Sequence, residues 1–421
     1  MLETLNPEAV VLEAARTPMT SIVRHLYVHV PFCAHKCEYC AFYSAPPSGD
    51  QVNRYVDAVV RELELVAPRC QPETIFFGGG TPSLLNLRQW ETILEAMRRW
   101  GLLGAKEFTV ECNPATVSED KARLLRSAGV NRISMGVQSL EPALLERLGR
   151  IHSRDMVFRS YDTLRAAGFD SVSIDLMFAI PGQTMEIWRR TLDEALALGT
   201  EHLSCYEVIY EEDTALYEQL KAGKFDLDED LACDQYETLV DRSAEAGFQQ
   251  YEVANFARNT RANGGAPELG DPAEGLAMSD LPTFASRHNA AYWLGRDFFG
   301  LGPSASEYVD GVRSRNWSNT TLYCEQLERG RRSKEFAEAL PPLSRAGELA
   351  AFGLRMNAGW RYSEFEKRTG FDLRTEWAED LRALEACGWA EIGPERFRLT
   401  RQGLRFADSA AVRMLRPEPG T

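Results

Sequence analysis

The feature that most restricts the fold of this chain is a regular alternation of two kinds of segment between residues 23 and 210. Short β-branched or aromatic runs, which favour strands, occur at Val23–Val30, Thr74–Phe77, Glu107–Glu111, Arg132–Val137, Ser171–Met177 and His202–Val208. Stretches with apolar residues three and four positions apart, which favour helices, lie between them at Val52–Val66, Leu87–Trp100, Glu119–Ala128 and Met185–Leu198. Glycines stand where helices should end, at Gly101, Gly129, Gly168, Gly199 and Gly247. The alternation predicts an α/β fold with a parallel sheet, either open or curled toward a barrel.

The pattern changes twice further along the chain. Residues 258–285 are rich in Gly, Pro, Asn and Asp without periodicity, which indicates a long polar surface loop or a locally disordered insertion, with a mobile lid as the functional alternative. After residue 340, three helical stretches precede two short strands with a turn near Gly393, which predicts a winged-helix-like α+β domain. The three helical stretches are Arg345–Met356, Tyr362–Thr369 and Arg374–Ala386. The predicted organisation is an N-terminal extension (1–22), a core barrel (23–255), a polar insertion loop (256–286), a connecting segment (287–340) and the winged-helix-like domain (341–421).

Charge and apolar patterning exclude several classes of function. The net charge of −15 argues against a nucleic-acid binder, which needs a clustered basic surface, although a winged helix alone would suggest one. Residues 1–20 lack the basic start and apolar core of a signal peptide, and no apolar run reaches membrane-spanning length. We therefore expect a cytoplasmic protein.

Three of the nine cysteines, Cys33, Cys37 and Cys40, are clustered in "CAHKCEYC", and the other six are scattered singly. Clustered thiols in a reducing compartment indicate a soft metal rather than disulfides. A structural zinc ion needs four ligands, and only His29 or His35 lies near enough in sequence to complete the set. An iron–sulfur cluster held by three cysteines instead keeps one iron open for the amine and carboxylate of an amino acid.

Polar residues follow several predicted strands, at the edge where ligands of parallel sheets bind. Gly78–Thr81 follow the second strand, and Glu111, Gln138 and Asp175 end the third, fourth and fifth. Glycines there allow bare backbone to approach a ligand. We expect these groups to bind a cofactor together with the cysteines.

The CxxxCxxC pattern with Tyr39 before its last cysteine resembles the signature of radical S-adenosylmethionine enzymes. The resemblance implies a partial (β/α)6 radical SAM barrel, a [4Fe-4S] cluster and bound S-adenosylmethionine, whose reductive cleavage gives a 5′-deoxyadenosyl radical. It also implies an electron donor such as a flavodoxin or ferredoxin.

Five further motifs, "LYVHVPFC", "FFGGGTPS", "MGVQS", "DLMFAIPGQT" and "RHNAAYW", resemble the oxygen-independent coproporphyrinogen III oxidases and the related HemW haem chaperones. This resemblance implies cluster ligation by Cys33, Cys37 and Cys40. It implies cofactor contacts by Tyr27, Tyr39, Gly79, Gly80, Thr81, Glu111, Gln138, Arg150, Asp175 and Tyr206. No catalytic acid or base is assigned.

Two features favour the chaperone branch over the oxidases. The oxidases carry a fourth cysteine two residues after the cluster motif, where this chain has Phe42, and their N-terminal extension is longer than residues 1–20. The HNxxYW motif is linked in the chaperone branch to haem binding and comprises His288, Asn289, Tyr292 and Trp293. An imidazole can ligate haem iron and aromatic rings can cover the macrocycle, although a structural histidine beside two core aromatics would give the same pattern.

The resemblance therefore predicts a haem chaperone that passes haem to an acceptor protein, respiratory or membrane-associated, with peripheral membrane contact through that acceptor. The alternative is a coproporphyrinogen III oxidase that removes carboxyl groups from two propionates. The insertion near residues 258–285 departs from the usual chaperone sequence ahead of the HNxxYW motif.

Overall fold

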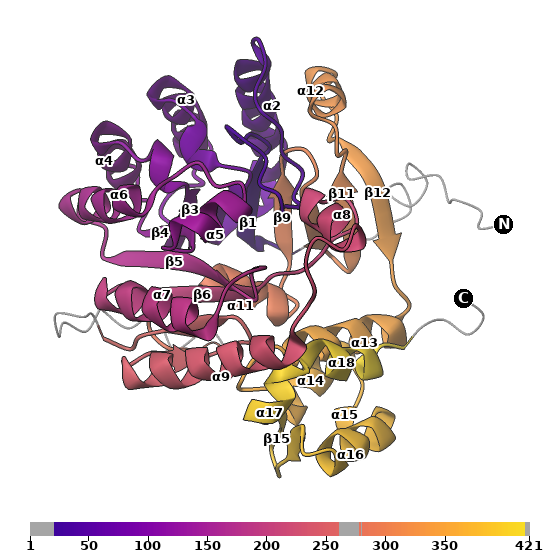
Figure 1. Cartoon of the computed structure of the whole chain (residues 1–421). Helices are drawn as coiled ribbons and strands as arrows, with labels where there is room; N and C mark the ends of the chain where they lie inside the picture. Colours follow the sequence, from indigo (N-terminus) through magenta and orange to yellow (C-terminus); the bar gives the residue numbers. More distant parts are fainter. Residues whose placement is uncertain (1–20, 261–277, 279, 417–421) are drawn as a thin grey trace. The chain divides into compact units, whose positions relative to one another are not determined.

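The computed structural model describes residues 21–260, 278 and 280–416 and divides them into two compact units (Figure 1). The first unit contains residues 21–200, 205–232 and 297–339. The second contains residues 201–204, 233–260, 278, 280–296 and 340–416. Residues 1–20 and most of the predicted insertion loop lie outside the described residues.

Five parallel strands form the centre of the first unit, in the order in which they occur in the chain. They are β1 (Val23–Val30), β2 (Cys70–Gly79), β3 (Glu107–Cys112), β4 (Arg132–Gln138) and β5 (Ser171–Phe178). Alternate strand residues such as Val28, Phe77 and Ile133 are almost fully buried, as expected for a parallel sheet covered on both faces. The predicted strands and the parallel sheet are confirmed.

Helices alternate with these strands: α2 (Gln51–Val66), α3 (Leu87–Arg99), α4 (Glu119–Ser127), α5 (Pro142–Arg147), α6 (Arg154–Ala166) and α7 (Met185–Ala197). The sequence determines both ends of several of them. Asn86 begins α3 with a reciprocal capping box to Gln89, and Ser118 accepts a hydrogen bond from the first turn of α4. Gly101 and Gly129 follow the same two helices with φ of 69° and 98°, a backbone conformation that glycine adopts without strain.

Four strands that were not among the predicted ones extend the sheet beyond β1. β9 (Phe298–Leu301) pairs with β1 in parallel, and β10 (Ser306–Val309), β11 (Val312–Asn316) and β12 (Lys334–Ala339) continue antiparallel. The helix α12 (Thr320–Glu328) lies between β11 and β12 in sequence and packs on α2. Helices α12, α2, α3, α4 and α6 thus follow one another along the outer side of the strands (Figure 1).

A buried charge cluster joins α2 to this extension; it consists of Glu62, Glu307, Arg332 and Lys334. The fully buried Glu62 carboxylate accepts hydrogen bonds from Gly302 N (2.9 Å), Tyr323 Oη (2.7 Å) and Arg332. Arg332 also lies 2.8 Å from the Glu307 carboxylate. Burial opposes ionisation of Glu307, but the positive charges of Arg332 and Lys334 outweigh the effect of burial. Together they lower the pKa of Glu307 to about 2.

The second unit begins with a small antiparallel group of strands. Residues His202–Ser204 of β6 (His202–Glu207) pair with β8 (Asn255–Ala257), which also pairs with β7 (Gln249–Gln250). Most of α9 (Glu229–Glu245) and all of α11 (Arg287–Trp293) belong to the same unit.

The remainder of the second unit forms a winged-helix-like domain, as predicted. It comprises α13 (Pro342–Gly353), β13 (Trp360–Arg361), α14 (Tyr362–Thr369), α15 (Leu373–Glu376), α16 (Ala378–Ala386), β14 (Ala390–Ile392), β15 (Arg396–Leu399), α17 (Arg401–Arg405) and α18 (Ala407–Met414). The sheet order is β13-β15-β14. The stretch Arg374–Ala386, expected as one helix, is divided at Trp377, whose indole is buried against Phe365 and donates to Met414 O (2.8 Å).

Candidate cofactor site

A cavity of about 450 Å³ opens at the carboxyl ends of the parallel strands of the first unit. All but one of the cofactor-site residues predicted for the barrel line it. They are Cys33, Cys37, Cys40, Tyr39, Gly79, Gly80, Thr81, Glu111, Gln138, Arg150, Asp175 and Tyr206. The exception is Tyr27, which is not among the lining residues and whose hydroxyl lies 3.0 Å from the His29 ring. The structure therefore brings together groups from seven separate segments of the chain.

The three thiols lie on the loop between β1 and α2, and the backbone holds this loop closed. Cys33 N donates to Ala45 O (3.2 Å), and Cys40 N donates to Cys37 O (3.2 Å). Thr81 Oγ1 donates to Cys33 Sγ (3.4 Å), and Arg150 Nη1 donates to Cys37 Sγ (3.5 Å). Donors of this kind stabilise thiolates, which are the form that binds iron.

The three thiols fit an iron–sulfur cluster better than they fit a single metal ion. Among the described residues, no three His, Cys, Asp or Glu side chains converge closely enough to hold one metal ion. The ligands of a [4Fe-4S] cluster bind different irons, so their sulfurs need not meet at one point. Three half-buried thiols line one open cavity, which is compatible with such a cluster.

Glycines bring bare backbone to the wall of the cavity at the end of β2. Gly80 N donates to Val30 O (2.8 Å) and Thr81 N donates to Phe32 O (2.7 Å), which ties this turn to the strand before the cysteine loop. A Cβ on Gly80 would lie 2.6 Å from Val30 O, and one on Gly79 would overlap the buried ring of His29. A larger residue at either position would displace the turn that faces the cofactor.

Replacement of Gly79 by alanine is expected to destabilise the protein far more than the same change at Gly129. Both glycines have φ of 98°, so both variants incur a backbone cost of about 1 kcal/mol. Only at Gly79 does the new methyl group meet a buried ring, because Gly129 has open space around it, and overpacking adds roughly 1–3 kcal/mol. Urea unfolding of the two variants measures the difference, and equal losses would contradict the steric explanation.

Charged groups of opposite sign face the cavity. Glu111 accepts a hydrogen bond from Gly79 N (3.1 Å), and Ser134 Oγ donates to both oxygens of Asp175 (3.0 and 3.2 Å). Burial, together with the nearby charge of Asp175, raises the pKa of Glu111 to about 8. Arg150 donates to Gly136 O (2.5 Å) and keeps its positive charge beside Cys37. Such a cavity suits a ligand that carries an ammonium and a carboxylate group.

Gln138 occupies a strained part of the cavity wall. Its φ is 65°, which is uncommon for a residue with a side chain, and the His152 ring bonds to the preceding carbonyl of Val137 (3.1 Å). Burial lowers the pKa of His152 to about 4, so the ring is neutral at physiological pH. Strained residues of this kind cluster at functional sites, and the prediction of Gln138 as a cofactor contact is consistent with that placement.

The mouth of the cavity carries an apolar rim, which we define as Phe42, Ile151, Tyr206 and Ile209. Their exposed fractions are 67%, 49%, 42% and 66%, and all four line the cavity. Sequence reasoning named Tyr206 as a cofactor contact and Phe42 as a branch marker, and it missed Ile151 and Ile209. The sequence offered one indication of each: Ile151 directly follows Arg150, and Ile209 directly follows the sixth predicted strand.

The HNxxYW residues lie on α11 in the second unit. His288 is 1% exposed, and its Nε2 is 2.7 Å from Tyr292 Oη. Ser286 caps the helix by accepting from Asn289 N (3.3 Å), and the guanidinium of Arg355 stacks 4.6 Å from the Trp293 ring. Haem ligation by His288 stays a prediction, and it would require this buried side chain to become accessible to haem.

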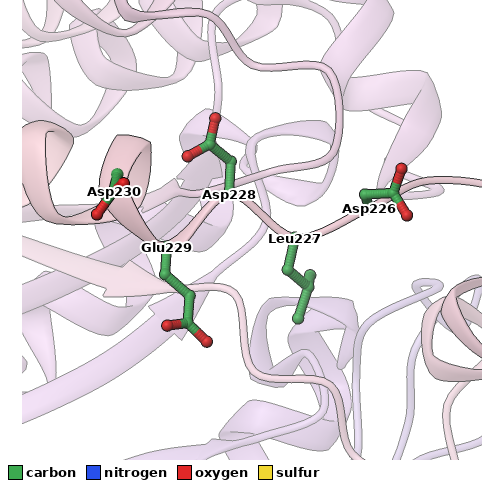
Figure 2. Close-up of a pocket in the computed structure, with 5 residues that line it drawn as sticks. All are labelled: Asp226, Leu227, Asp228, Glu229 and Asp230. Carbon is green, nitrogen blue, oxygen red and sulfur yellow. The ribbon is translucent and has the colours of Figure 1, made fainter.

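A second cavity of about 610 Å³ is lined by Asp226, Leu227, Asp228, Glu229 and Asp230. Figure 2 shows that the carboxylates of Asp228 and Glu229 point to opposite sides of the chain and that Asp226 lies apart from both. Because these carboxylates do not converge, we assign no ligand to this acidic segment.

The comparisons with known proteins agree with this fold. Residues 27–195 match the radical SAM superfamily and residues 340–406 match the HemN C-terminal domain. The chain is 32% identical to the haem chaperone HemW of Lactococcus lactis over 391 residues, which cover 92% of this chain and 96% of the relative. It is likewise 32% identical to the haem chaperone HemW of Bacillus subtilis over 388 residues, 90% of this chain and 96% of the relative.

A solved structure with the same fold is the coproporphyrinogen III oxidase HemN of Escherichia coli, a radical SAM enzyme. It matches with a TM-score of 0.79 at 22% identity and covers 97% of this chain and 93% of the oxidase chain. The predicted radical SAM fold is thereby confirmed. Because the sequence similarity to the chaperones extends over almost the whole length of both chains, this protein belongs to the HemW family of radical S-adenosylmethionine proteins.

Proposed function

We propose that this protein is a haem chaperone that binds haem and transfers it to an acceptor protein. The observation that carries the proposal is the 32% identity to proteins named haem chaperones over at least 90% of the chain. We further propose that Cys33, Cys37 and Cys40 hold a [4Fe-4S] cluster beside S-adenosylmethionine. The placement of all three thiols in one cavity with Gly79 and Gly80 supports this assignment.

The chain's own residues would then hold the amino-acid end of S-adenosylmethionine. Asp175 supplies negative charge for its ammonium group, the buried Glu111 carboxyl offers it a hydrogen-bond acceptor, and Arg150 supplies positive charge for its carboxylate. The backbone at Gly79 and Gly80, which carries no side chains, permits close approach of S-adenosylmethionine. The cluster and S-adenosylmethionine, when bound, supply one-electron chemistry, and the surrounding residues position the cofactor and exclude water.

The proposed partners are haem, a haem-requiring acceptor protein and an electron donor such as a flavodoxin or ferredoxin. The acceptor is proposed to be a respiratory, membrane-associated protein that the chaperone meets from the cytoplasm. No helix in the described part of the chain combines the length and apolar character needed to cross a bilayer.

The second candidate is a coproporphyrinogen III oxidase, and the fold shared with HemN is the observation that favours it. Phe42 counts against this candidate, because the oxidases resemble one another in carrying a cysteine at that position. Phe42 is an exposed part of the rim instead.

One anaerobic experiment separates the two candidates. Cluster-loaded protein is titrated with haem while the Soret band is followed, and a second sample receives coproporphyrinogen III, S-adenosylmethionine and dithionite. A chaperone is expected to bind about one haem per chain tightly and to form no decarboxylated product. Formation of protoporphyrinogen with weak haem binding would reject the chaperone and favour the oxidase.

A further inference from the structure

The six histidines of the chain are all among the described residues, and five of them are buried with a ring nitrogen already bonded. The bonding partners are Thr74 for His25, Tyr27 and Tyr43 O for His29, Val137 O for His152, Tyr251 for His202 and Tyr292 for His288. A buried imidazole must become accessible before a ring nitrogen can bind haem iron, and that change costs free energy.

His35 is the one histidine whose side chain is exposed. It lies between Cys33 and Cys37 and lines the mouth of the cofactor cavity. Its ring rests over Gly149, where φ is 70° and a Cβ would lie 3.5 Å from His35 Nε2. No hydrogen bond between the His35 ring and another described residue was found, so a nitrogen is available for a metal at the surface.

The surroundings of His35 suit a flat apolar ligand rather than a hydrated ion. The same cavity mouth carries the apolar rim, in which Phe42 and Ile209 are each about two-thirds exposed. Large apolar side chains grouped at a cavity mouth are typical of surfaces that a ligand covers. Lys36, exposed beside His35, offers a positive charge to a propionate group.

We propose that haem binds on the apolar rim with its iron ligated by His35, over the mouth of the cavity that holds the cluster and S-adenosylmethionine. This inference rests on the proposed function, since it takes haem to be the cargo. It places the haem site in the first unit, whereas the sequence pattern pointed to His288 in the second. Haem on the rim closes the cofactor cavity, so binding of haem and binding of S-adenosylmethionine are coupled.

The test compares His35→Gly with His288→Gln, which removes the competing ligand named by the sequence motif, in cluster-loaded protein. His35→Gly is expected to raise the Kd for haem at least tenfold and to shift the Soret band, and added free imidazole is expected to restore the wild-type spectrum. His288→Gln is expected to leave the spectrum and Kd unchanged. Iron analysis of each variant checks that the cluster is intact.

A second variant tests the haem site without altering the cysteine loop, which His35→Gly could disturb. Ile209→Ser lies outside that loop and is expected to raise the Kd for haem several-fold without moving the Soret band, because the axial ligand remains. Unchanged haem binding in both His35→Gly and Ile209→Ser would overturn the proposed site while leaving the chaperone function intact. Absence of haem binding by the wild-type protein would instead reject the proposed function itself.

Discussion

Replacement of Cys37 by serine is expected to lower the iron content of anaerobically reconstituted protein from about four atoms per chain to nearly none. The same loss is expected for Cys33 and Cys40, because each thiol binds a different iron and two ligands do not retain the cluster. The broad brown absorbance should disappear together with the iron. Iron and sulfide analysis after removal of unbound metal measures the effect, which is the largest we expect from any single substitution.

The control for this series is Cys387→Ser. Cys387 is an exposed cysteine in the winged-helix-like domain, far in sequence from the cavity loop, so its replacement is expected to leave the iron content unchanged. Full iron retention by a Cys37 variant would contradict the assigned ligands. Stoichiometric zinc without iron in the wild-type protein would favour the structural zinc site that the sequence left open.

Replacement of Arg332 by methionine is expected to destabilise the protein by about 3–5 kcal/mol, because it leaves the buried Glu62 carboxylate without its cationic partner and Glu307 with Lys334 alone. Arg332 lies 3.2 Å from Glu62 and 2.8 Å from Glu307, and both carboxylates are almost completely buried. The matched control is Arg54→Met, which removes an exposed, solvent-screened ion pair with Glu328 and is expected to cost far less. Chemical denaturation at pH 7 measures both values.

The same variant should lose part of the protein's sensitivity to acid. Because the pKa of Glu307 is about 2 in the folded protein, below its ordinary value of 4.5, the ionised carboxylate stabilises the fold above pH 4.5. This contribution is lost as the pH falls from 4.5 toward 2. Without Arg332 the pKa of Glu307 rises, so the free energy of unfolding of the variant should change less over that range. An identical pH profile would show that Arg332 does not hold the charge of Glu307.

The parts of the fold that follow from local sequence patterns were predictable. The strand from Val23 to Val30 and the helix from Tyr362 to Thr369 have their predicted bounds, because apolar periodicity and glycine positions define them. The clustering of Glu111, Gln138 and Asp175 with the cysteines was also predictable, since parallel strands bring their carboxyl ends to one edge.

Features that depend on contacts distant in sequence were not predictable. The strands β10 and β12 are short and carry glutamates such as Glu307 and Glu338, so they lack a strand-like apolar alternation. Glu307 is stabilised in the sheet by Arg332, a partner that no local pattern reveals. The burial of His288 and the exposure of His35 likewise depend on the folded structure, and the motif alone could not distinguish the two imidazoles.

The pairing of β1 with β9 has a consequence for synthesis on the ribosome. His25–Val28 pair with Phe298–Leu301, and residues 233–296 between these strands belong to the other unit. At about 5–20 residues per second, the nascent chain displays the outer edge of β1 for tens of seconds before β9 has been made. An apolar strand with an open edge readily pairs with other chains. The risk of aggregation is therefore highest while this protein is still being translated. Slowing elongation before residue 298 would lengthen the time for which the edge of β1 is unpaired.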